Sequence, residues 1–483
     1  MACLRWTLPC LFAVAMAMPH YCFSQSPASN QRASGSALDS SGNKMFGSLL
    51  KELMRMIPGE VEPGSQLDVS LREVVELFSN RKLKEAQSEL EKLEASSSRI
   101  PPTKLLLAAM AYAVGDGNSG KRLLEAAAIT NSEYPDIYFS FARLAIGQNR
   151  ITDADALADK ALLAIQSSDG AFDSEQIDHF KRRYYDAKYQ VAKGRGKMDD
   201  AKAAVAELAA IAPEAVQTLV ARAEIAFDAN EMDNALGFLR KAGQQQTADS
   251  FRPAEVTLAS WLQRKGKNNE AGVLLKKAAG ERQADEKVQL ALAQWSINQE
   301  DFPGTLMAVK AIEEIKGDTN VSRELRGKTA FAQGAYAMAE NHFKRLTADN
   351  PANSDYANLY ALSLAHSPKK EKQDLAVNLA RKIAQARSGN VTAVSSLAYV
   401  LIKTGQLDAA KTILTTVAKQ PNLNVEVTFI ICYMLSETGQ TDQAKQVLER
   451  IVGANGLFLF RNEAKKLLKR ISQSAGGLPN PIR

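Results

Sequence analysis

Small residues recur along most of the chain at a spacing of 34 residues. We call these positions anchors, and they are Ala86, Gly120, Ala154, Ala201, Ala235, Ala271, Thr305, Ala339, Ala376, Ala410 and Ala444. Seven of the ten steps between consecutive anchors equal 34 residues, and the other three, of 47, 36 and 37 residues, contain insertions. A constant period of this length indicates a repeat array, in which each unit packs on its neighbours, rather than a domain with one central core.

Apolar residues follow every anchor at helical spacing. The positions four residues later hold Leu90, Leu124, Ala158, Val205, Leu239, Leu275, Val309, Phe343, Ala380, Leu414 and Leu448. The positions seven residues later hold Leu93, Ala127, Ala161, Leu208, Ala242, Ala278, Ile312, Leu346, Ile383, Val417 and Ile451. Residues separated by three or four positions lie on the same face of an α-helix. The pattern therefore predicts an amphipathic helix in each of the eleven repeats.

A turn is predicted five residues before the anchor, where it separates this helix from a preceding one. Six of these positions hold glycine, at Gly115, Gly196, Gly266, Gly334, Gly405 and Gly439, and two hold asparagine, at Asn149 and Asn230. Glycine and asparagine tolerate the left-handed backbone conformation that ends a helix. Each repeat is therefore predicted to consist of helix, turn and helix.

A further column of small residues lies twelve residues before the anchors, at Ala108, Ala142, Ala223, Ala259, Ala293, Gly327, Ala361, Ala398 and Cys432. Together with the turn glycines and the closing prolines Pro213 and Pro351, these columns resemble the tetratricopeptide repeat family over about four fifths of the chain. The resemblance implies an all-α fold, a right-handed α-solenoid of about eleven helix-turn-helix repeats that binds a protein or peptide partner. The family's leading Trp is missing from every repeat, and most repeats lack the closing Pro.

Residues 1–24 have the pattern of a secretory signal peptide. Arg5 precedes an apolar run from Trp6 to Met18, which is shorter than the about 20 residues that a membrane span needs. Cleavage after Ala17 and cleavage after Ser24 both fit. We expect an exported protein of the bacterial cell envelope, periplasmic or secreted, with no transmembrane span in the mature chain. Removal of residues 1–24 leaves Cys432 as the single cysteine, which excludes an internal disulfide.

Composition divides the rest of the chain. Residues 25–44 are polar and almost free of apolar side chains, which predicts a disordered linker. Residues 45–62 form an amphipathic helix, either a cap on the first repeat or a surface that binds a membrane or a partner. The repeat array covers residues 63–458, a C-terminal capping helix covers residues 459–472, and residues 473–483 are predicted to be a disordered tail.

The main irregularity of the array is the 47-residue step, which adds thirteen residues around residues 167–179. An extended helix that packs its own aromatic residues and a functional loop are both compatible with it.

The chemistry of an enzyme is not predicted. His179, His342 and His366 lie in different repeats with no second histidine at the spacing of a metal site. The glycine-rich residues 194–197 fall between two helices rather than after a strand, which excludes a phosphate-binding loop. We therefore expect no catalytic residue, no cofactor and no metal.

Charge differs between the two halves of the chain. Residues 1–250 hold 28 Lys and Arg against 32 Asp and Glu, and residues 251–483 hold 32 against 22, which gives −4 and +10. We expect a non-catalytic scaffold or adaptor that holds a partner segment in the concave groove of the solenoid. An alternative is that the basic C-terminal half binds an anionic envelope polymer such as an acidic polysaccharide. Export makes nucleic acid an unsuitable partner.

A candidate partner-binding stripe lies eight residues before the anchors, on the first helix of the repeats. Seven of its positions are large and apolar: Phe78, Tyr112, Ile146, Phe227, Ile297, Phe331 and Ile402. The four others are Lys193, Gln263, Ala365 and Ser436, and a fully buried position does not readily accept Lys or Gln. Packing inside the repeat and partial exposure on the groove both remain open, and we expect the seven side chains to contact a partner.

Overall fold

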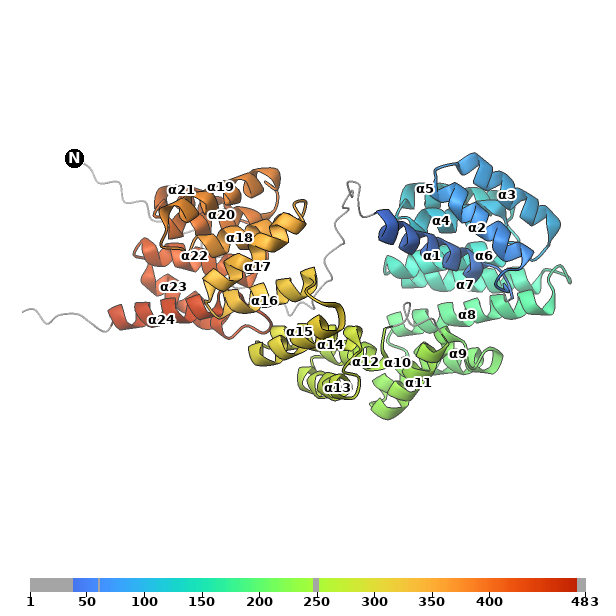
Figure 1. The fold of residues 1–483 in the computed structure, drawn as a ribbon. Helices are drawn as coiled ribbons and strands as arrows, with labels where there is room; N and C mark the ends of the chain where they lie inside the picture. Colours follow the sequence, from blue (N-terminus) through green and yellow to red (C-terminus); the bar gives the residue numbers. More distant parts are fainter. Residues whose placement is uncertain (1–37, 60, 246–251, 476–483) are drawn as a thin grey trace, which may run out of the picture. The chain divides into compact units, whose positions relative to one another are not determined.

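The computed structural model describes residues 38–59, 61–245 and 252–475 (Figure 1). Within these residues the chain forms 24 α-helices and no strand, which confirms the prediction of an all-α fold. The chain divides between Ala254 and Glu255 into two compact units, and each is described by itself. We call them the N-terminal and the C-terminal unit.

Helix pairs make up both units. The N-terminal unit contains α1 (Leu38–Met56), α2 (Gln66–Ser79), α3 (Leu83–Ser96), α4 (Thr103–Ala113), α5 (Gly117–Thr130), α6 (Pro135–Gly147), α7 (Ile151–Gln166), α8 (Ser174–Gly194), α9 (Met198–Ile211), α10 (Val216–Asp228) and α11 (Met232–Gln244). Helices α2 to α11 form five pairs, and the anchor lies on the second helix of each pair.

The C-terminal unit continues with six more pairs and a last single helix. Its helices are α12 (Ala254–Arg264), α13 (Asn268–Glu281), α14 (Glu286–Asn298), α15 (Phe302–Lys316), α16 (Asn320–Ala332), α17 (Tyr336–Asp349), α18 (Ser354–Leu364), α19 (Lys370–Ala386), α20 (Val391–Lys403), α21 (Leu407–Val417), α22 (Val425–Glu437), α23 (Thr441–Val452) and α24 (Arg461–Ala475). All eleven anchors are buried. The predicted count of eleven repeats is therefore confirmed.

The turns inside the pairs have the predicted left-handed backbone. All six turn glycines and both asparagines have a positive φ, between 59° and 83°. Arg81 and Glu300 occupy the same turn position in two other pairs, with φ of 62° and 56°. A non-glycine side chain is strained in this conformation. The left-handed conformation of the turn is therefore imposed by the helix-turn-helix geometry of the repeat, and not only by the type of residue at that position.

The 47-residue step is occupied by the extended helix α8. Asp173 and Gln176 form a capping box at its start, and Phe172 and Phe180 pack edge to face with ring centroids 5.0 Å apart. Tyr134 from the preceding pair packs on both rings. Of the two alternatives for residues 167–179, the helix that packs its own aromatic residues is the one observed.

The terminal segments differ from the prediction at their boundaries. Helix α1 begins at Leu38, so residues 38–44 are helical and the prediction of a linker is wrong there; residues 1–37 lie outside the described part. Helix α24 continues to Ala475, so the predicted tail begins later than residue 473, and residues 476–483 also lie outside. Amphipathic spacing predicted both helices, but the polar residues that extend them carry no such signal.

Close packing between neighbouring pairs gives a first prediction, on Gly272 in α13, which follows the anchor Ala271 and faces Trp295 of α14. A methyl group there would come within 2.1 Å of the ring of Trp295, and the indole N–H holds this ring in place by donating to the carbonyl oxygen of Asn268 at 3.0 Å. Gly272→Ala is expected to lower the free energy of unfolding of the C-terminal unit by about 1–3 kcal/mol. Thermal unfolding of the wild type and the variant measures this difference in stability.

Gly280 provides the matched control, because it lies in the same helix and has nothing within 4 Å of its Cβ position. Gly280→Ala is expected to leave the stability unchanged or to raise it by about 0.5 kcal/mol. Equal stability of the two variants would contradict the close approach of Trp295.

Candidate partner-binding site

The first helices of consecutive pairs contact one another in both units, for example α6 with α8 and α20 with α22. They form one surface in each unit, which we call the first-helix face. The candidate stripe lies on these first helices, so this face is where a partner site is expected.

Helix α1 covers part of the first-helix face of the N-terminal unit. Leu49 and Leu53 are fully buried, in one hydrophobic cluster with side chains of α2 and α4. Further along α1, the Glu52 carboxylate accepts a hydrogen bond from Arg143 of α6 at 3.1 Å, and Met56 Sδ lies 3.2 Å from Arg183 of α8. The helix thus crosses the first helices of four pairs, rather than capping the first repeat alone.

A cavity of about 140 Å³ lies between α1, α4, α5 and α6. Its apolar lining includes Met56, Leu105, Ala108, Ala109, Tyr112, Leu124 and Leu144, and its polar lining consists of Glu52, Arg55, Ser140 and Arg143. An apolar cavity of about 150 Å³ is large enough for a benzene ring. The cavity is therefore large enough for one apolar side chain, next to a charged rim.

The rim carries more positive than negative charge. Arg55 donates to both oxygens of Glu52, at 3.1 and 2.8 Å, and Arg143 donates to the same carboxylate. Burial alone would raise the pKa of Glu52, but the two guanidinium groups outweigh it and hold the pKa below its usual range. Two cations therefore share one ionised carboxylate at the edge of the cavity.

A buried ion pair lies deeper in the same face. Asp136 Oδ2 lies 2.9 Å from Arg183 Nη1 and 3.2 Å from His179 Nε2. Burial alone would raise the pKa of Asp136, but the charge of Arg183 and the hydrogen bond with His179 hold it below its usual range. The second oxygen of Asp136 and the hydroxyl of Tyr134 are both buried and have no hydrogen-bond partner among the described residues.

The structure separates the candidate stripe into two groups. In the N-terminal unit Phe78, Tyr112 and Ile146 are half-buried, and Tyr112 lines the cavity. The other four side chains are buried: the exposed fractions of Phe227, Ile297, Phe331 and Ile402 are 8, 4, 1 and 6%. These four side chains expose little surface while the terminal segments are in place, and their contact with a partner stays a prediction.

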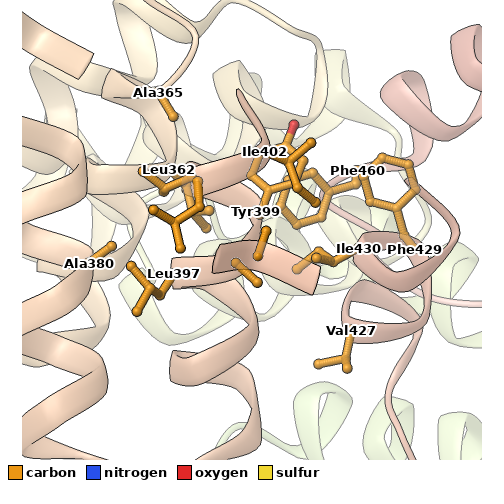
Figure 2. Packing of buried hydrophobic residues seen from close by; sticks show 14 of the residues in the cluster. Leu362, Ala365, Ala380, Leu397, Tyr399, Ile402, Val427, Phe429, Ile430 and Phe460 are labelled. Atoms are coloured by element: carbon orange, nitrogen blue, oxygen red, sulfur yellow. The ribbon is translucent and has the colours of Figure 1, made fainter. Parts of the chain in front are cut away.

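Residues 457–475, which we call the C-terminal segment, cover the first-helix face of the C-terminal unit. Phe460 contacts the rings of Phe331, Tyr399 and Phe429, with centroids 5.4, 4.8 and 5.1 Å apart. Figure 2 shows Phe460 next to Tyr399, Phe429 and Ile402. The segment was predicted to cap the end of the array, but it lies across several pairs, and it buries Phe331.

The charged residues of the site were missed by the sequence analysis. Asp136 and Arg143 precede the stripe residue Ile146 by ten and three positions on α6, so helical spacing places all three on the same side of that helix. A search for charged residues three and ten positions before each stripe residue would have found Asp136 and Arg143. Nothing in the sequence indicated that α1 supplies Glu52 to Arg143.

Comparison with known proteins supports no more than the fold. No protein-family model matches the chain, and no curated protein matches it. Solved structures that match include a tetratricopeptide repeat protein from Parabacteroides merdae (13% identity, 53% of this chain and 98% of that one, TM-score 0.42) and the yeast protein Tom70 (12%, 85% and 97%, 0.30). The Cut9–Hcn1 assembly of the APC/C also matches, at 12% identity over 84% of this chain and 96% of that one, with a TM-score of 0.35.

At these values the likeness carries no argument about function, and the class rests on the chain's own repeats. The 34-residue period, the small-residue columns and the eleven helix pairs define the chain as an α-solenoid of the tetratricopeptide-repeat type.

Within the described ranges, no helix is long and apolar enough to cross a membrane, and no group of three or more His, Cys, Asp or Glu side chains is placed to hold a metal ion. Cys432 is buried in its small-residue column, and burial raises the pKa of its thiol to about 12.

The buried ion pair gives a second prediction. Because the pKa of Asp136 in the folded chain is lowered, its contribution to stability is present above the unfolded pKa near 3.8 and is lost as the pH falls through the lower folded value. Asp136→Asn is expected to destabilise the N-terminal unit by about 3 kcal/mol at pH 7 and to reduce the loss of stability below pH 4. Urea unfolding at several pH values measures both.

Asp153→Asn is the control, because Asp153 pairs with Arg150 on an exposed surface of the same unit. Its effect should be negligible at every pH, since exposed ion pairs contribute little. Unchanged stability of Asp136→Asn at pH 7 would show that the buried pair contributes nothing.

Proposed function

We propose that the chain is a non-catalytic scaffold that binds a segment of a partner protein on the first-helix face of its N-terminal unit. The observation that carries this proposal is the cavity beside α1, together with the half-buried Phe78, Tyr112 and Ile146. The same face already holds an amphipathic helix, α1, through apolar side chains and an ion pair. A surface that binds one such helix has the chemistry to bind a second segment beside it.

The lining of the cavity favours a particular partner segment. Its apolar part fits one large apolar side chain, and such anchors dominate the binding energy of interfaces. On the rim, Arg55 and Arg143 share the single carboxylate of Glu52, so a further acidic side chain would be attracted there. We therefore infer a partner segment with a large apolar residue next to an acidic one.

The proposed location is the bacterial cell envelope, periplasmic or secreted. It rests on the signal-peptide pattern of residues 1–24, which lie outside the described residues. The mass of the mature protein tests whether this signal is removed, because cleavage after Ala17 and cleavage after Ser24 each give a defined mass.

Filling the cavity provides the third prediction. Ala109 lines it from α4, and Ala109→Leu is expected to weaken partner binding at least tenfold, about 1.4 kcal/mol, while the melting temperature stays the same or rises. A photo-cross-linking residue placed at position 112, in protein expressed in the native host, identifies the partner. The yield of this cross-link with and without Ala109→Leu measures the loss of partner binding.

Ala95→Leu, on an exposed position of α3, is the matched control and should leave the cross-link unchanged. The proposal fails if position 112 gives no protein cross-link, or if Ala109→Leu leaves the yield as it was.

A specific observation favours binding of an anionic polymer as a second function. Lys344, Arg345, Arg381 and Lys382 lie five and six residues after two consecutive anchors, on α17 and α19. All four are exposed, and no acidic side chain of the described ranges pairs with them. Four unpaired cations on neighbouring repeats attract a polyanion such as an acidic polysaccharide.

Salt dependence gives the fourth prediction. Exposed charges are screened beyond about 8 Å at physiological ionic strength. Binding to an acidic polysaccharide should therefore fall at least tenfold between 20 and about 200 mM salt, and the double variant Lys344→Gln with Arg381→Gln should weaken it at low salt. Lys121→Gln, in the N-terminal unit, should have no effect. Binding that is insensitive to salt would exclude this function.

A further inference from the structure

We propose that the first-helix face of the C-terminal unit is a second recognition site, which binds a partner segment of the pattern aromatic-x-aromatic-Arg followed by an amphipathic helix. The C-terminal segment of the chain is the built-in occupant of this site. The inference concerns another face than the site proposed above and does not depend on it.

The aromatic residues of the segment are inserted as anchors. Phe458 and Phe460 are both buried, with exposed fractions of 1 and 2%. Phe460 stacks on Phe429 and also contacts Tyr399 (Figure 2) and Phe331, and these three rings come from three different first helices. Phe458 packs edge to face on Phe429, with ring centroids 6.0 Å apart. Aromatic side chains held in this way carry most of the energy in peptide recognition.

Arg461, which follows the second aromatic residue, is bound by the carboxylate of Glu300. Arg461 Nε donates to Glu300 Oε1 at 2.7 Å, and the backbone N–H of Phe458 donates to the same oxygen at 3.3 Å. Glu300 is one of the two turn residues in the strained left-handed conformation. Strained residues are retained where the position serves a function. Its carboxylate contacts the segment from 161 residues away in the sequence.

The helix of the segment is recognised along one side. Ala464, Leu467 and Ile471 are buried, at the spacing of a helix that lies in a groove. Glu463 accepts a hydrogen bond from Tyr336 at 2.9 Å and pairs with Lys403 at 3.5 Å. The opposite side, with Lys465, Lys466 and Lys469, is exposed.

The segment is joined to the repeats as a ligand on a tether. Residues 453–456 connect it to α23 without helical structure, and Gly456 has a φ of 87°. The six helix pairs of the unit are complete without it, because every anchor already has its partner helix. A tethered occupant has an effective concentration of about millimolar, so a free segment of the same pattern competes only when the tethered one is weakened.

Binding of a labelled synthetic peptide of residues 455–473 to the full-length chain tests the proposal. We expect weak binding to the wild-type chain and at least tenfold tighter binding to Phe460→Ala, because the free peptide fills the position that the variant vacates. A peptide with alanine at both aromatic positions should not bind. Adding Glu300→Gln to the Phe460→Ala chain should remove the gain.

Arg461→Gln provides a second variant that removes no apolar side chain, in case Phe460→Ala does not fold. It should also increase peptide binding, and Ala109→Leu, in the other unit, should not. The proposal is overturned if both variants lower the melting temperature without any gain in peptide binding, since the segment is then an integral part of the core. It is also overturned if the wild-type chain dimerises and the variants do not, because the occupant is then a second copy.

Discussion

The close approach of paired helices is the interaction on which the structure depends. It is possible only because a small residue stands at every anchor and, on the facing helix, at nearly every position twelve residues earlier. Gly120 and Gly327 show how little space is left within a pair, since a methyl group at either would meet an aromatic ring of the paired helix within 3 Å. Interiors packed at this density transmit a change in one pair to its neighbours.

Repeated pairing creates a surface that needs a cover. The first helices present apolar side chains side by side, and large exposed apolar patches are unfavourable unless something binds them. The chain covers this face in each unit with a terminal segment of its own. In the C-terminal unit the cover is close, and Phe331 and Ile402 are buried under or beside it. In the N-terminal unit α1 leaves Tyr112 half-buried and a cavity next to it.

The fold was predictable from the sequence and the site only in part. A turn residue such as Gly334 and an anchor such as Ala339 are fixed by local backbone geometry and by contacts within one repeat, which a period reveals. The burial of Phe331 depends on Phe460, a contact between residues 129 positions apart in the sequence, and no period marks it. The same holds for Glu52 and Arg143. Covering segments lie outside the repeat, so their place on it is set by shape and charge rather than by spacing.

Hydrogen exchange of the backbone amides tests most directly whether the chain covers its own first-helix faces. Peptides from residues 45–57 and 457–471 of the full-length protein are measured beside peptides from α4 and α20. We predict that the two terminal segments exchange nearly as slowly as those first helices, since they lie buried against them. Exchange of both segments within seconds, with the repeats still protected, would contradict the account, because the faces would then be open.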